Sequence, residues 1–206
     1  MRYAGLDVSK SCTGWGLVTP SGAQAGTFRC PIHRPFNLPK GKLDATYAGK
    51  VGDWFFRQLD AWLCKMKPDI IAIEQPKPGN LTRNKTEVDY SGLFAGESLK
   101  TTKVGNTNFE TSHMLQSLAF GAAAVCVRRG LEPRYVPVKT WRSTVGIKTA
   151  PANEKNPTAW YKKQAKTLVS AHGHDIKSGD AAEGLCIAFW LREQHAPTQD
   201  LFSVAS

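Results

Sequence analysis

Four acidic residues stand where the sequence predicts the ends of two strands and the start of a helix. Asp7 ends a short apolar run, which would pair with the glycine-marked run at 13–18 as a β-hairpin. Glu74 ends a second apolar run, and Asp180 and Glu183 stand three residues apart, which places them on one helix face. An aspartate on a buried strand costs free energy unless it gains a metal ion, a cation or hydrogen bonds. The four carboxylates therefore predict a cation site.

The chemistry that suits such a set is the hydrolysis of a phosphodiester. Two Mg²⁺ ions about 3.5–4 Å apart activate a water and neutralise charge on the leaving oxygen. Mg²⁺ prefers carboxylate and water oxygens and uses few protein ligands beside the substrate phosphate. We expect two Mg²⁺ ions per site, with Mn²⁺ as a substitute, and the catalytic and metal-binding residues to be Asp7, Glu74, Asp180 and Glu183.

Each carboxylate also has a simpler interpretation. Asp7 could close the hairpin through an Asx-turn, and Glu74 could be an ordinary acid at the end of a strand. Asp180 could be a helix N-cap with Glu183 as its capping-box partner, because D-x-x-E is that signature. Four such residues in matching contexts favour the shared site.

The charge of the chain indicates a polyanionic partner. The 206 residues carry a net charge of +10, and the basic residues recur in clusters. Each phosphate that a lysine or arginine neutralises releases counterions and adds affinity that is independent of base sequence. A basic surface kept for solubility is the alternative.

Composition places the chain among globular proteins and suggests one domain over 1–206. Asp7 and Lys10 interrupt the first apolar run, so no signal peptide is expected, and no run is long enough to span a membrane. Five scattered cysteines without a CxxC pair argue against structural zinc and disulfides. We expect a cytoplasmic protein of a bacterial or phage-infected cell, without a nucleotide cofactor, since no GKT/S phosphate loop occurs.

The predicted elements alternate between strands and helices, which favours an α/β mixed sheet with helices packed on its faces. In chain order, the predicted strands are 2–8, 13–19 and 24–30, then about 70–74 and 134–138. The predicted helices are 43–66, 111–129, 158–171 and 180–193, with a shorter element at 139–145.

The segment 77–108 breaks this pattern, because it is rich in Gly, Asn, Thr and Lys. A loop of this length inside a compact domain is usually functional. It leaves the sheet directly after Glu74, so we expect it to face the substrate.

Four stretches together resemble the signature regions of the RuvC family of Holliday-junction resolvases. They occur in family order and span nearly the whole chain apart from 77–108, and they read GLDVSKSCTGWGLV, IIAIEQP, VPVKTWRSTVGI and GDAAEGLCIAFW. The resemblance implies an RNase H-like fold with a five-stranded sheet, a homodimer, and Mg²⁺-dependent nicking of two symmetric strands at a four-way DNA junction. It assigns Asp7, Glu74, Asp180 and Glu183 to the metal site.

Three departures from the family pattern point to a divergent relative of phage type. Val-Ser-Lys-Ser follows Asp7 in place of the usual Pro-Gly type of turn, Glu183 replaces the commoner Asp, and the loop after Glu74 is longer. The resemblance places Lys139 and Arg142 near the scissile phosphate and an aromatic wedge in the long loop. The expected DNA contacts are Lys77, Arg83, Lys85, Tyr90, Phe94, Lys139, Arg142, Lys148 and Lys155.

Other functions stay open at this stage. The chain could be an RNase H-like nuclease acting on RNA or on other branched DNA, or a junction-binding protein without activity. His113, His172 and His174 are possible general bases. For the homodimer, we expect a contact through the helix 111–129, whose small residues at 119 and 121–124 would allow close approach. The alternative is that this face of small residues packs on the chain's own sheet.

Overall fold

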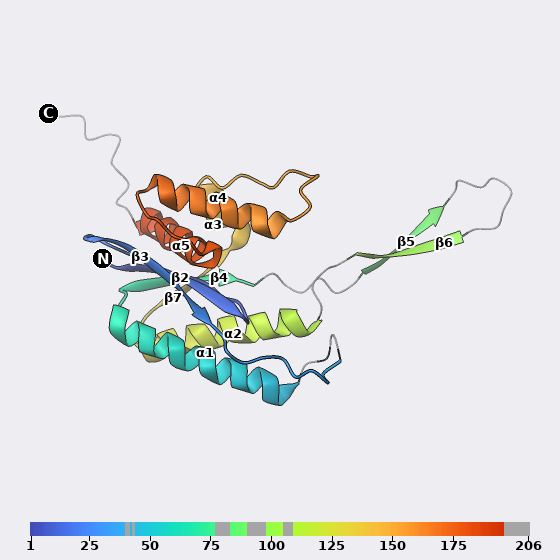
Figure 1. Cartoon of the computed structure of the whole chain (residues 1–206), viewed down its shortest axis with the longest axis horizontal. Coiled ribbons are helices and arrows are strands. Elements are labelled where there is room, and N and C mark those ends of the chain that lie inside the picture. Colours follow the sequence, from blue (N-terminus) through green and yellow to red (C-terminus); the bar gives the residue numbers. More distant parts are fainter. Residues whose placement is uncertain (40–41, 43, 77–82, 90–97, 105–108, 196–206) are drawn as a thin grey trace.

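The fold is a five-stranded mixed sheet with helices on both faces (Figure 1). The computed structural model describes residues 1–39, 42, 44–76, 83–89, 98–104 and 109–195. The strand order is β3-β2-β1-β4-β7, in which β1, β4 and β7 run parallel and β2 and β3 antiparallel to their neighbours. The strands are β1 Tyr3–Asp7, β2 Cys12–Thr19, β3 Gly22–Arg29, β4 Ile70–Gln75 and β7 Pro133–Pro137. This arrangement confirms the predicted α/β fold class.

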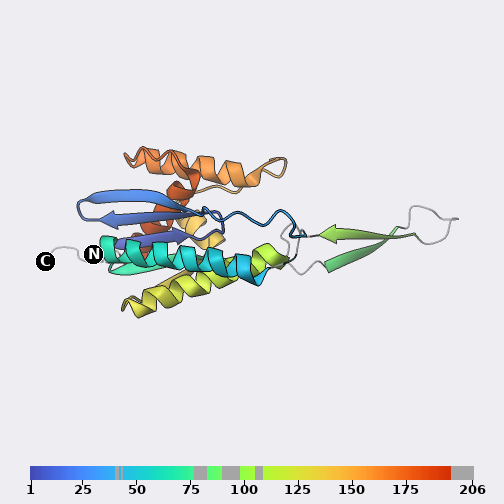
Figure 2. The ribbon, with the colours of Figure 1, turned by 60° about the horizontal axis from the view of Figure 1, so that its bottom comes forward.

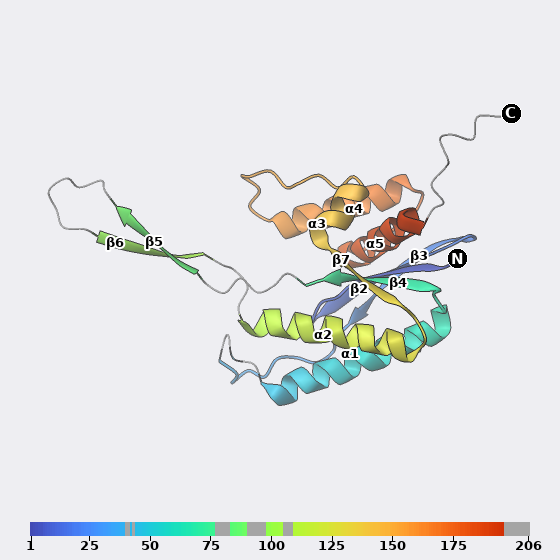
Figure 3. The same ribbon diagram turned by 180° about the vertical axis from the view of Figure 1, so that it is seen from behind.

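Two helix layers enclose the sheet (Figures 1 and 3). Helices α1 (Ala45–Met66) and α2 (Phe109–Arg128) cover one face. The other face is covered by α3 (Val138–Thr144), α4 (Pro157–Ala171) and α5 (Gly179–His195). Local signals set the helix starts: the Asp44 side chain accepts from the Tyr47 amide at 2.6 Å, and Asn156 caps α4 just before Pro157. The ends lie within about two residues of those predicted.

Side-chain alternation along β1 and β4 decides which residues face which helix layer. Leu6 and Ile71 belong to the core under α1 and α2, whereas Ala72 belongs to the core under α5. A Cβ on Gly5 would meet the backbone of α5, so Gly5 faces α5 and the odd-numbered residues of β1 lie on that side. Successive strand residues point to opposite faces. Asp7 and Glu74 therefore lie on the face that α5 covers.

Helix α5 is buried along most of its length and lies directly against strand backbone. Every residue from Ala181 to Leu191 is buried. A Cβ at Gly14 would overlap the Asp180 carbonyl, and one at Gly184 would lie 2.7 Å from the backbone of Trp15. Glycines on both sides thus allow contact without side chains between them. This close packing brings the first turn of α5 to the end of β1.

The segment 77–108 differs from the predicted loop. Its described part forms two paired antiparallel strands, β5 (Arg83–Asp89) and β6 (Ser98–Val104). The ribbon projects away from the five-stranded sheet in all three views (Figures 1–3). Its strands contain Thr and Val, residues that favour extended backbone, although the high Gly, Asn and Lys content of the segment hides this preference.

Two further sequence predictions can be compared with the structure. In the described part of the chain, no helix combines the length and the apolarity that crossing a membrane requires. All five cysteines are free thiols, as expected from their scattered positions.

Candidate active site

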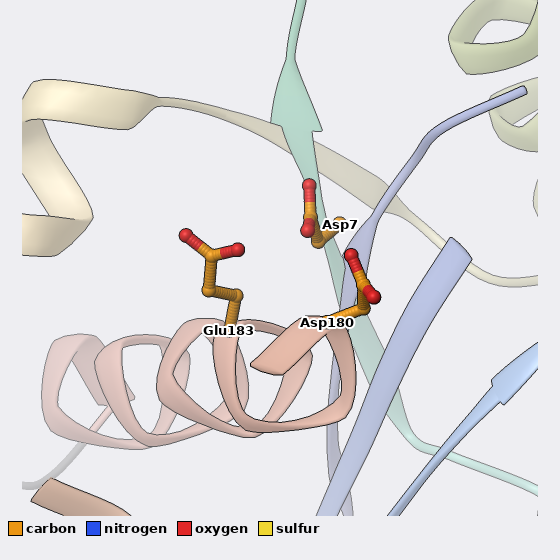
Figure 4. A group of neighbouring side chains, drawn as sticks. All are labelled: Asp7, Asp180 and Glu183. Carbon is orange, nitrogen blue, oxygen red and sulfur yellow. The ribbon is translucent and has the colours of Figure 1, made fainter. Parts of the chain in front are cut away.

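Three carboxylates from distant parts of the chain meet at one point (Figure 4). Asp7 ends β1, and Asp180 and Glu183 extend from the first turns of α5. One oxygen from each lies within 4.8 Å of the others. Asp7 and Asp180 are half-buried and Glu183 is buried. Within the described residues, this is the acidic group whose spacing suits a shared cation.

Glu74 lies beside this group but outside it. It pairs in the sheet with Val136 of β7, and the preceding pair Leu6–Ile73 places β4 alongside the end of β1. Its Oε2 accepts a hydrogen bond from the indole Nε1 of Trp141 at 2.9 Å. The structure therefore brings the four predicted carboxylates to one site, with three in direct proximity and the fourth held by α3.

All four carboxylates line an open cavity of about 940 Å³. Its walls come from the ends of β1, β4 and β7, from α3, and from the starts of α2, α4 and α5. Basic and aromatic side chains complete it, namely Lys139, Arg142, Tyr161 and Lys162. A cavity with an acidic floor and basic walls can accept a metal ion and an anionic ligand together.

Two cations contact the carboxylates directly. Lys162 Nζ lies 2.6 Å from Asp180 Oδ1, and Arg142 Nη2 lies 2.8 Å from Glu183 Oε1. The Arg142 guanidinium also stacks over the Tyr161 ring, 4.0 Å from its centroid. These pairs offset part of the repulsion among the acidic groups.

The electrostatics of the cluster favour a further cation. Burial raises the pKa of Asp7 well above its ordinary value, and the neighbouring charges of Glu74, Glu183 and Asp180 add to the shift. Burial also raises the pKa of Glu183, although Arg142 opposes this shift. Ionised carboxylates in such a position gain stability from a bound metal ion.

The simpler interpretations of Asp7, Asp180 and Glu183 are wrong. Helix α5 begins at Gly179, and the Ser178 hydroxyl accepts from the Ala181 amide at 3.4 Å, so Asp180 is not the N-cap. Glu183 pairs with Arg142 in place of a capping box. The turn after Asp7 is closed by Ser9 and Thr13, whose hydroxyl groups bond backbone atoms across it.

The predicted DNA contacts have different positions. Lys139 and Arg142 line the cavity on α3. Lys148 and Lys155 are exposed and stand apart from the cavity lining. Arg83 and Lys85 belong to β5. Lys77, Tyr90 and Phe94 lie outside the described residues.

Three side chains at the site, Trp141, Tyr161 and Lys162, were not singled out from the sequence, and two of the histidines named there pack against an aromatic ring. None of the three has a special spacing in the sequence. The packing of α4 against α5 brings Tyr161 and Lys162 to the cavity, whereas Trp141 is buried on α3 and reaches the site only through its hydrogen bond to Glu74. His172 and His174 lie against the Phe189 ring, at centroid distances of 5.1 and 6.0 Å. Neither belongs to the described lining of the cavity.

Comparison with known proteins identifies the fold. No protein-family model matches the chain, and no curated protein matches it in sequence. Among solved structures, Thermus thermophilus RuvC in complex with a Holliday junction substrate superposes with a TM-score of 0.56 at 11% identity, over 95% of this chain and 96% of that one. A second Thermus thermophilus RuvC structure gives 0.56 at 12% identity, over 92% of each chain. The chain has a RuvC-like resolvase fold. The yeast mitochondrial Holliday junction resolvase Ydc2 matches at 11% identity with a TM-score of 0.46, over 93% of this chain and 78% of that one.

Within this RuvC-like fold, the residues present fit a divalent metal. The donors are carboxylate oxygens, which hard cations such as Mg²⁺ and Mn²⁺ prefer. Asp7, Asp180 and Glu183 are close enough to share an ion, and Glu74 lines the same cavity. An ion held here would lie among groups that otherwise repel one another.

Proposed function

We propose that the chain is a metal-dependent endonuclease that resolves four-way DNA junctions by paired symmetric nicks in DNA recombination and repair. The observation that carries this proposal is the convergence of Asp7, Asp180 and Glu183 within 4.8 Å on the floor of an open, basic-walled cavity. A decayed, non-catalytic binding protein would have no reason to retain the set.

Each side chain has a task in this reaction. Asp7, Asp180 and Glu183 would hold the metal ions, with Glu74 as a fourth ligand. Two Mg²⁺ ions, when bound, would activate a water and neutralise charge on the leaving oxygen. Trp141 orients Glu74 through its N–H, and Arg142 holds Glu183 while it presents charge to the phosphate. Lys139, on the cavity wall, contributes to phosphate binding.

DNA as the partner is supported by charge and by the fold. The chain carries +10, and a strongly basic protein gains affinity for any phosphate backbone. A structure with the same fold is a RuvC in complex with a Holliday junction substrate. We propose the ribbon β5–β6 as a contact with the junction, since Arg83 and Lys85 lie on it and it follows β4, the strand that holds Glu74, along the chain.

A homodimer would supply two equivalent sites for the two symmetric strands. Most of the small residues expected to form its contact instead pack within the chain, and only Ala124 of that set is exposed. Ala119 and Ala122 are buried in the core, and a Cβ at Gly121 would overlap the Phe56 ring of α1. A stripe of exposed residues on α2 consists of His113, Ser117, Phe120, Ala124 and Val127. Its residues are spaced alternately four and three apart, as in paired helices, so this stripe suits a dimer contact better than the buried small residues.

The test is a comparison of substrates. End-labelled four-way, Y-shaped and linear DNA, and the matching RNA, are incubated with the protein in Mg²⁺, and the cuts are mapped. Cleavage of the four-way junction at positions symmetric about the crossover is expected, with linear DNA left intact. Equal cutting of the Y-shaped DNA would broaden the substrate to branched DNA, and preferred cutting of RNA would overturn the proposal.

A further inference from the structure

Lys162 reaches the metal site across a glycine. The stem of Lys162 passes over Gly179, where an added Cβ would lie 2.7–3.0 Å from its Cβ, Cγ and Cδ atoms. This contact directs the ammonium group onto Asp180 Oδ1 at 2.6 Å. The Asp180 side chain is only 22% exposed, so the lysine covers an oxygen that a metal ion would otherwise use.

The two cations of the site are held differently. Arg142 is 19% exposed, bonds the buried Glu183, and stacks on the rings of Tyr161 and Trp141 at 4.0 and 5.1 Å. A planar guanidinium fixed on three sides keeps its place. Lys162 is 34% exposed, and its ammonium group, at the end of a flexible four-carbon stem, forms an ion pair with Asp180. Of the two, Lys162 is the cation that can leave.

We propose that Lys162 occupies the place of a metal ion at Asp180 in the metal-free enzyme. When the metal binds, Lys162 leaves Asp180 and pairs with a phosphate of the DNA instead. This inference rests on the proposed function, because it takes Asp180 as a metal ligand. An ion on Asp180 repels the ammonium group at close range. Lys162 lines the same cavity that would receive the scissile phosphate, so a short rotation of its stem gives it a new anionic partner.

The exchange makes metal and DNA binding reinforce each other. Without DNA, the metal must displace Lys162 and binds less tightly than the carboxylates alone would allow. With DNA bound, the phosphate accepts Lys162 and the metal site opens. Lys162 is therefore a positioning residue that lets the site assemble when metal and DNA are both present.

The first test is calorimetric titration of Mg²⁺ into the full chain without DNA. Lys162→Met should bind Mg²⁺ about fivefold more tightly than the wild type, the scale of one partly exposed ion pair. Lys163→Met is the matched control. Lys163 follows Lys162 on α4, but it is exposed and lines a separate groove with Lys166 and Lys177. It should bind Mg²⁺ as the wild type does. Lys162→Gln, with a shorter stem, serves as a second variant, and thermal melts check folding.

The second test measures junction binding in Ca²⁺ and in EDTA. Ca²⁺ should strengthen binding by the wild type and by Lys163→Met, and this gain should shrink severalfold in Lys162→Met and Lys162→Gln. Unchanged or weaker Mg²⁺ affinity in both Lys162 variants, or an unchanged Ca²⁺ gain, would overturn the exchange. Absence of Mg²⁺ binding by the wild type would instead overturn the proposed metal site itself.

Discussion

The indole N–H of Trp141 donates a hydrogen bond to Glu74 Oε2 at 2.9 Å, across 67 residues of sequence. Trp141 is fully buried, so its ring cannot turn away without disturbing the core under α5. The bond ties the end of β4 to α3 and fixes the direction of the Glu74 carboxylate. Loss of a group that orients a metal ligand in this way typically costs about 10- to 100-fold in metal affinity or activity.

Trp141→Phe is predicted to impair the reaction more than the fold. Phenylalanine keeps most of the buried ring but removes the N–H, so Glu74 loses its orientation. Cleavage should fall roughly 10- to 100-fold, with a higher Mg²⁺ concentration needed for half-maximal rate. Initial rates across a Mg²⁺ titration measure both effects.

Trp62→Phe is the matched control for this substitution. Trp62 is also buried, but its Nε1 has no hydrogen-bond partner among the described residues. It lies on α1, on the opposite face of the sheet from Trp141. The control should cut junctions at the wild-type rate. An equal loss in both variants would mean that Trp141 acts through packing alone.

Asp7→Asn is predicted to stabilise the metal-free protein at neutral pH. Because the pKa of Asp7 is raised in the folded state, the folded protein holds this proton more tightly than the unfolded chain. Stability is therefore lost as pH rises from the ordinary carboxyl value of about 4 through the raised pKa. The amide carries no charge and avoids this loss, so the variant should have the higher free energy of unfolding at pH 7.

Thermal melts in EDTA between pH 4 and pH 8 test this pH dependence. The wild type and Asp7→Asn should have similar melting temperatures near pH 4. As pH rises, the melting temperature of the variant should become the higher of the two. Mg²⁺ should then stabilise the wild type but not the variant. A metal-free variant that is less stable than the wild type at pH 7 would show that Asp7 is held by favourable partners.

Gly14→Ala is predicted to disturb both stability and activity. The new methyl would overlap the backbone carbonyl of Asp180, which forces α5 away from β2. Overpacking of this kind costs roughly 1–3 kcal/mol. Gly49→Ala on α1 is the matched control, since nothing lies within 4 Å of its added Cβ and alanine favours a helix by about 0.5–1 kcal/mol. Denaturant melts should show loss in the first and a small gain in the second.

Phe120→Glu is predicted to separate the proposed dimer. Phe120 is 66% exposed on α2 and lies at the centre of the stripe from His113 to Val127. A charge there should weaken association by about tenfold or more in sedimentation experiments. Phe36→Glu is the control, because Phe36 is also exposed but lies on the segment after β3. A monomeric wild type at micromolar concentration, with and without junction DNA, would contradict the dimer.

The sequence predicted the sheet and the acidic site because both depend on local patterns. Apolar runs that end in Asp7 and Glu74, and a helix that starts at Asp180, specify strand ends and a helix start without knowledge of packing. Lys162 and Trp141 could not be found in this way, because their roles depend on how α3 and α4 lie against α5. Lys162 and Lys163 are adjacent in sequence, yet they face different pockets.

The ribbon β5–β6 was missed for a related reason. Its pairing joins Arg83 with Val104, and such a contact leaves no periodic apolar signal when few of its residues are apolar. A two-stranded ribbon has no buried face of its own to mark the sequence.

The most direct measurement is Mg²⁺-dependent cutting of a labelled four-way junction by the wild type and by Asp7→Asn, Glu74→Gln and Asp180→Asn, with junction binding measured in parallel. Each variant should lose more than about a hundredfold in cleavage, beyond the loss from groups that merely orient a ligand. Each should bind the junction at least as tightly as the wild type in EDTA, because a negative charge has been removed near the phosphate. Near-normal Mg²⁺-dependent cutting by Asp7→Asn would contradict the proposed active site.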